Sequence, residues 1–250
     1  MHGYWKTFET KSDNGQGLLK KIMGLADDKK YLADLLNTRA VLKQDIYANT
    51  IEWFKVLKKS VEKCLDELKD QISDPRIRLR LEDKSDTEIR LYIGSDVIVF
   101  AMHTNVFKFS EQDYAAQTSY VQREPKNGYC GVIQIYNFLA DSYEYNRFND
   151  VGYMIGRLFI NHENHFLVEG KQQLGFLYRN FMNQVINEAM MEEIVYKIAI
   201  QAIDFELLSP PYQMVEKTTV HELQSLSISS ELKTGKRLGF RFSSEQDLEA

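Results

Sequence analysis

The middle third of the chain favours a series of short strands separated by tight turns. The expected strands are residues 77–81, 88–93, 97–103, 106–109, 129–139, 143–148, 151–161 and 165–169, with a longer polar segment at 110–127. Apolar and polar residues alternate in several of them, which is typical of strands with one buried face. Most connections are too short to hold crossover helices, so successive strands must run antiparallel. The sequence therefore predicts an antiparallel meander of about seven strands.

The chain before this sheet carries the apolar spacing of helices. From residue 17 to residue 72, apolar residues recur every three or four positions and proline is absent, which predicts two helices. The second helix has an apolar stripe with a 3.5-residue repeat, and Pro75 follows its end. This stripe either packs inside the chain, in a helical hairpin, or joins two chains in a homo-oligomer. The stripe residues expected to make such an association are Ile51, Phe54, Val61 and Leu65.

Helical spacing returns after the sheet, between residues 174 and 205. It predicts a long C-terminal helix packed on the sheet. The expected fold class is therefore α+β, an antiparallel sheet preceded by a helical hairpin and covered by this helix. We divide the chain into an N-terminal helical region, 1–73, and a sheet region with C-terminal helices, 74–250. These regions form either two domains or one folding unit.

Charge and cysteine content exclude several classes of protein. The 31 basic and 36 acidic residues give a net charge of -5, which makes nucleic-acid binding an unfavoured role. The two cysteines, Cys64 and Cys130, are too few for a disulfide scaffold. No apolar run approaches the roughly 20 residues of a membrane-crossing helix, and no signal sequence opens the chain. We therefore expect a cytoplasmic protein without a role in a membrane.

One short motif is typical of metal-dependent hydrolases that act on phosphodiesters. Glu169 and Lys171 end an apolar strand, where a carboxylate that holds magnesium and a lysine that steadies the transition state would point the same way. Such a site also needs a second acid, and Asp150 is the candidate. If the hairpin sets Glu169 opposite Leu158, Asp150 lies about 27 Å farther along the partner strand. The simpler interpretation is a solvated Glu and Lys at a strand end.

Two histidines flank the turn of the same hairpin. His162 and His165 are separated by Glu163 and Asn164. Two or three ligands on an exposed turn are a weak signal for zinc, and tight turns are often polar for other reasons. We therefore predict no metal and no other cofactor.

Three arginines alternate with apolar residues on one expected strand. Arg76, Arg78 and Arg80 form this row, and Arg90 extends it across the first hairpin. The apolar residues of both strands lie on one face if the residue numbers of each cross-strand pair add up to an even number. One such register sets Arg80 opposite Glu88. Guanidinium groups in a row suit the phosphates of a ligand. The other interpretation is a solvated sheet face that nearby acids neutralise.

Tyrosines are dense between residues 114 and 153. We expect Tyr143 and Tyr145 to share one strand face, and Tyr136 and Phe138 to share another. Rings with a polar tip suit a ligand cavity or a protein contact. They suit the outer face of a twisted sheet equally well.

These patterns leave two hypotheses about function. The first is a noncatalytic regulatory or assembly module that binds a small ligand or a protein through the tyrosine and arginine residues, and associates through its N-terminal helices. The alternative is a metal-dependent phosphodiester hydrolase, nuclease-like, centred on Glu169 and Lys171. Because the only catalytic motif lacks its second acid, the sequence favours the first hypothesis.

Overall fold

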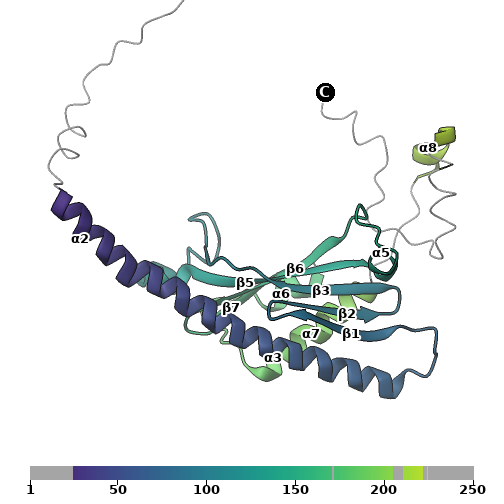
Figure 1. Cartoon of the computed structure of the whole chain (residues 1–250), viewed down its shortest axis with the longest axis horizontal. Helices are drawn as coiled ribbons and strands as arrows, with labels where there is room; N and C mark the ends of the chain where they lie inside the picture. Colours follow the sequence, from purple (N-terminus) through teal and green to yellow (C-terminus); the bar gives the residue numbers. More distant parts are fainter. Residues whose placement is uncertain (1–24, 171, 205–210, 222–223, 225–250) are drawn as a thin grey trace, which may run out of the picture. The chain divides into compact units, whose positions relative to one another are not determined.

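The computed structural model in Figure 1 describes residues 25–170, 172–204, 211–221 and 224. The chain divides into two compact units, residues 1–44 and 45–250. In the first unit, α2 (Leu25–Leu35) passes into a π-helical turn, η1 (Leu36–Ala40), and then into the start of α3 (Val41–Gln71). The helical backbone shows no reversal between these elements, so the predicted helical hairpin is wrong. The linking residues include neither glycine nor proline, and nothing there stops a helix.

The second unit is built on an antiparallel sheet of seven strands. The order is β1-β2-β3-β5-β6-β7, and the short β4 pairs with the beginning of β5. The α+β class and the antiparallel meander are therefore confirmed. The strands are β1 (Leu79–Ser85), β2 (Glu88–Ile93), β3 (Asp96–Met102), β4 (Phe107–Lys108), β5 (Tyr129–Leu139), β6 (Tyr153–Asn161) and β7 (Phe166–Gly170).

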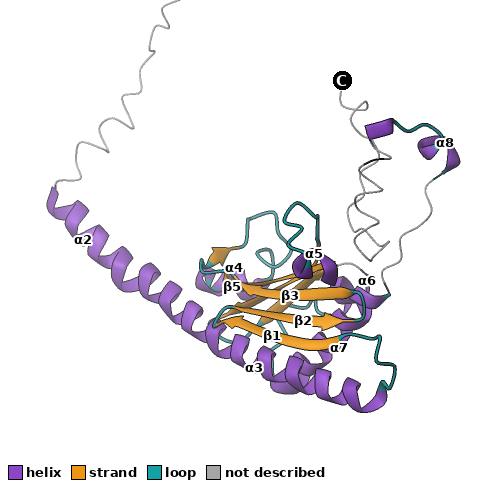
Figure 2. Ribbon diagram, turned by 45° about the vertical axis from the view of Figure 1, so that its right-hand side comes forward, coloured by secondary structure: helices purple, strands orange, loops and turns teal. Residues whose placement is uncertain are grey.

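One face of the sheet is covered by two helices, α3 and α7 (Glu188–Ile203) (Figure 2). The alternation of β2 and β3 turns every second side chain, such as Leu91 and Phe100, toward these helices. The apolar stripe of α3 meets them there, and α7 adds residues at helical spacing, such as Ile194 and Ile198. This layer forms the main core.

The opposite face of the sheet is covered in two separate places. Toward the start of β5, Val132 packs with Phe181 and with residues of the 109–128 segment, which holds α4 (Ser119–Arg123) and the 3₁₀-helix η2 (Pro125–Gly128). Toward the end of β5, Tyr92 and Val97 pack with α5 (Ala140–Glu144). We call this second covered area the α5 end of the sheet.

The predicted strand at 143–148 is wrong. Ala140–Glu144 is helical, and a turn follows in which Asn146 takes a left-handed conformation with φ of 52°. The Tyr145 and Arg147 N–H groups donate to carbonyls of α5. The alternation of Tyr143 and Tyr145 therefore does not mark a strand. Tyr143 belongs to α5 and packs on Phe138 of the sheet from outside it.

The predicted long C-terminal helix is interrupted. It consists of α6 (Gln172–Leu177) and α7, and the residues between them run beside β7. Val168 and Phe166 of β7 donate backbone hydrogen bonds to Tyr178 and Gln184 of this segment. Asn187 then starts α7, since its side chain accepts a hydrogen bond from the Met190 N–H at 2.9 Å. The apolar residues of this segment have helical spacing, but its backbone hydrogen bonds to the edge of β7 keep it from continuing the helix.

Two predicted registers differ from the observed ones. Arg80 faces Tyr92 instead of Glu88, because the hairpin turns at residues 86–87, later than that register requires. An irregularity between Asp83 and Ser85 changes the pairing by one further residue. In the β6-β7 hairpin Glu169 faces Arg157, one residue away from Leu158. The turn of that hairpin holds Asn164 at a φ of 64°, a conformation that asparagine tolerates better than most residues.

Asn164 is also the point at which α3 is tied to this hairpin. Its side-chain oxygen accepts hydrogen bonds from Asn49 Nδ2 at 2.9 Å and from Trp53 Nε1 at 2.8 Å. The polar groups of α3 therefore help to position the turn. Among the described residues, no helix is both long and apolar enough to cross a membrane.

Candidate ligand-binding site

A pocket of about 570 Å³ lies on the outer face of the sheet at its α5 end. Its floor comes from cross-strand rows that the register defines. Arg80 is paired with Tyr92, Tyr92 with Val97, and Val97 with Phe138. In the next row Glu82 is paired with Arg90. The residues that alternate away from the helices thus gather charged and aromatic groups on one surface.

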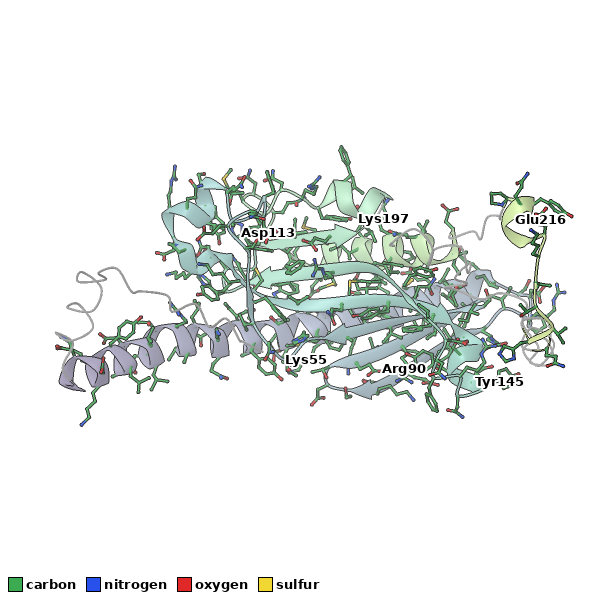
Figure 3. The ribbon with its side chains drawn as sticks, turned by 90° about the horizontal axis from the view of Figure 1, so that it is seen from above. Lys55, Arg90, Asp113, Tyr145, Lys197 and Glu216 are labelled. Atoms are coloured by element: carbon green, nitrogen blue, oxygen red, sulfur yellow. The ribbon has the colours of Figure 1, made fainter. Side chains whose placement is uncertain are left out.

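The other wall of the pocket comes from α5 and the turn after it. Tyr143, Glu144, Arg147 and Phe148 all line the pocket from this side. Figure 3 shows Arg90 on the sheet and Tyr145 toward the same end of it. Pockets of this volume are typical of sites for small molecules.

Aromatic rings hold two of the guanidinium groups of the pocket. Arg80 Cζ lies 4.0 Å from the ring centroid of Tyr92, and Arg90 Cζ lies 4.4 Å from that of Tyr143. The Tyr143 ring meets Phe138 edge to face, with centroids 5.5 Å apart. Such contacts orient planar cations and limit their rotamers.

Carboxylates compensate most of the positive charge. Glu82 lies 3.1 Å from an Arg80 nitrogen and 2.8 Å from Lys84 Nζ, and Glu88 lies 2.6 Å from Arg90 Nη2. Burial by itself would raise the pKa of Glu82, but the hydrogen bond from Lys84 and the charge of Arg80 outweigh burial and lower that pKa. Glu82 therefore stays ionised at neutral pH.

The two phenols of the pocket remain protonated donors. Burial raises the pKa of Tyr92, and the charge of Glu82 raises it further. Burial also raises the pKa of Tyr143, against the opposing charge of Arg90. The pocket thus offers neutral hydroxyl groups beside fixed charges.

Arg147 is the least satisfied cation of the pocket. Its side chain is 10% exposed, and Nε lies 2.8 Å from Asp150 Oδ2. That contact lacks hydrogen-bond geometry, and neither Nε nor Nη2 has a hydrogen-bond partner. The same Asp150 oxygen accepts a hydrogen bond from Ser142 Oγ at 2.7 Å. A buried guanidinium nitrogen without an acceptor is costly, so this group is poised for one.

The structure separates the three arginines of the predicted row. Arg80 lines the pocket, whereas Arg78 pairs with the buried Asp141 at 2.7 Å and with Glu144 at 3.2 Å. Arg76 precedes β1 in an exposed turn and pairs with Asp74. Arg90, the expected extension of the row, does reach the pocket.

The three predicted tyrosines also take different places. Tyr143 lines the pocket, and Tyr136 packs beside it on the sheet with Phe138. Tyr145 follows α5 and is exposed. Sequence reasoning missed Tyr92, whose alternation with Arg90 was visible but whose partner depended on the register. It also missed Arg147, which no pattern marked.

The residues of the hydrolase hypothesis do not come together in the part of the chain that is described. Glu169 forms an ion pair with Arg157, whose Nε lies 2.8 Å from Glu169 Oε2. Asp150 is engaged by Ser142 and Arg147. Lys171 lies outside the described residues. Within those residues, no three histidine, cysteine, aspartate or glutamate side chains are placed to hold a metal ion.

The stripe predicted to associate is used inside the chain. Phe54, Val61 and Leu65 are buried in the main core, and Ile51 packs against it. Burial closes Phe54, Val61 and Leu65 to another chain, whereas Ile51 is only partly buried. An oligomer of this chain stays a prediction, which light scattering tests, and it requires contacts beyond these three residues.

Comparison with known proteins assigns no role to the pocket. No protein-family model matches the chain, and no curated protein or solved structure matches it significantly. Its function must therefore be inferred from the chemistry of its own residues.

Proposed function

We propose that this protein is a noncatalytic binding module that holds a small ligand in the pocket at the α5 end of the sheet. The observation that carries the proposal is the pocket itself, which Arg80, Arg90 and Tyr143 line together. On a fully packed sheet face, other side chains would normally fill this space. Convergent polar groups beside exposed rings are typical of ligand sites.

The chemistry of the lining supports binding more than catalysis. Glu82 is bound by cations, and Asp150 is engaged by Ser142 and Arg147. The described residues that line the pocket include no histidine and no cysteine, the usual general base and nucleophile. The groups that remain are hydrogen-bond donors and ring faces.

A titration with simple aromatic probes tests this proposal. Phenol, benzamide and benzoate are added separately to ¹⁵N-labelled protein, and amide signals are followed by NMR. The signals that move should belong to β1, β2 and α5. A set of probes that moves none of these signals would contradict the proposal.

Two equally exposed phenylalanines provide a matched control. Phe148 is 88% exposed at the pocket, and Phe176 of α6 is 81% exposed and does not line it. Phe148→Ser should weaken binding of the aromatic probes about tenfold, since stacking on a ring contributes about 1.4 kcal/mol. Phe176→Ser should leave binding unchanged. Equal effects of the two substitutions would show that the probes bind elsewhere.

We also propose a cytoplasmic location. Cys64 and Cys130 are both free and buried, and burial raises the pKa of each thiol. Unpaired cysteines of this kind are typical of proteins from a reducing compartment.

A further inference from the structure

We infer that the pocket takes a small organic monoanion, a single carboxylate on an aromatic or apolar body, and that Arg147 receives the carboxylate. This inference rests on the proposed binding function and specifies its ligand class. Three features of the pocket support it.

The first feature is the unfilled hydrogen-bonding capacity of Arg147. Nη2 has no acceptor, and Nε has only the misaligned contact with Asp150. A carboxylate matches the planar fork of a guanidinium through two parallel hydrogen bonds. Because Nη2 is also closed to water, an incoming acceptor engages it by turning the guanidinium toward the pocket. The Asp150 oxygen that Arg147 would leave keeps its hydrogen bond from Ser142 Oγ.

The second feature is the balance of charge in the lining. Four cations, Arg80, Lys84, Arg90 and Arg147, face three carboxylates, Glu82, Glu144 and Asp150, and Glu88 beside Arg90 adds a fourth. The charges therefore balance, which leaves no excess positive charge for a ligand with several negative charges. A nucleoside triphosphate or another polyanion would instead meet three carboxylates at close range, where like charges repel strongly.

The third feature is the apolar surface beside these charges. Phe148 stands almost fully exposed at the pocket, and Phe138 and Tyr143 add ring surface to its wall. Exposed rings of this size gain free energy when a ligand covers them. A bare inorganic anion would leave them uncovered, so the ligand needs an apolar body.

Benzoate and benzamide form a matched pair of probes, because they differ in charge and hardly in shape. In the intact chain, benzoate should bind at least about tenfold more tightly than benzamide, as a charge-assisted hydrogen bond predicts. The Nε–H signal of Arg147 should move with benzoate and not with benzamide. This NMR readout needs no substitution, so it holds even if a variant fails to fold.

Substitution of Arg147 provides the second arm. Arg147→Gln should abolish the preference for benzoate while benzamide binds as before. Arg76→Gln, which removes an exposed arginine outside the pocket, should change neither affinity. Circular dichroism confirms that both variants are folded.

The outcomes separate this inference from the proposed function. Equal binding of benzoate and benzamide at the pocket would overturn the inference and leave the binding function standing. Inorganic phosphate that binds as tightly as benzoate would also overturn it, in favour of a phosphate site. If no probe binds at the pocket, both proposals fail.

Discussion

Gly131 marks a close approach of α3 to the sheet. A Cβ atom at this position would lie 2.0 Å from Thr50 Oγ1 and 2.8 Å from Thr50 Cβ. Thr50 is itself buried, and its hydroxyl donates to the Ile46 carbonyl at 2.7 Å. The helix can therefore lie this close to β5 only because residue 131 has no side chain.

Gly131→Ala should accordingly destabilise the protein by about 1–3 kcal/mol, the usual cost of overpacking a core. Urea unfolding measures the change. In the double variant with Thr50→Ala, the hydroxyl and methyl groups are gone and much of the loss should be recovered. A strictly additive double variant would argue against this contact as the cause.

At the scale of elements, α5 is held against the sheet by a buried ion pair. Asp141 of α5 has 1% of its side chain exposed and lies 2.7 Å from Nη1 of Arg78, the residue before β1. The Ala140 N–H also donates to the Ser95 carbonyl at 2.9 Å. One wall of the pocket thus depends on contacts outside the pocket.

Arg78→Ala should lower the free energy of unfolding by about 1.5–3 kcal/mol, because a buried carboxylate loses a charged hydrogen-bond partner. Arg76→Ala is the matched control. Its ion pair with Asp74 is exposed, and such pairs contribute about 0–1 kcal/mol. Denaturant unfolding of both variants measures the difference, and equal losses would contradict the assigned role of Asp141.

The same element shows which features could be predicted from the sequence. The strands β1 and β2 follow from a period of two, since one buried face fixes that pattern, and β3 follows from a continuous apolar run that is buried on both faces. The alternation of Tyr143 and Tyr145 produced the same signal without a strand, because Tyr143 packs on the sheet from outside it. A period alone does not distinguish a strand from a turn whose rings reach a neighbouring face.

The candidate site could be predicted only in part for a related reason. Arg80, Arg90 and Tyr143 were marked by their residue types. Their meeting depends on the register of the hairpin, and the position of its turn at residues 86–87 makes Tyr92 instead of Glu88 the partner of Arg80. Arg147 belongs to a turn, where no periodicity constrains the position of a side chain.

For the whole molecule, the division at residue 44 predicts independent folding of the larger unit. Among the described residues, the buried members of the main core lie between Phe54 and Ala202. A chain of residues 41–250 should therefore unfold cooperatively, with a melting temperature within about 4 °C of the full chain, which corresponds to about 1 kcal/mol. Thermal unfolding followed by circular dichroism measures this, and loss of the cooperative transition would show that the first unit is needed for the fold.

The carboxylates around Arg80 and Arg90 also govern how fast a ligand arrives. Since carboxylates already neutralise the cations, the electric field of the pocket extends only a short way into solution and steers few anions toward it. Association is then governed by diffusion and by the exchange of a carboxylate of the protein for the ligand. Discrimination among ligands should consequently reside in their lifetimes on the protein, with arrival rates that vary little with ionic strength.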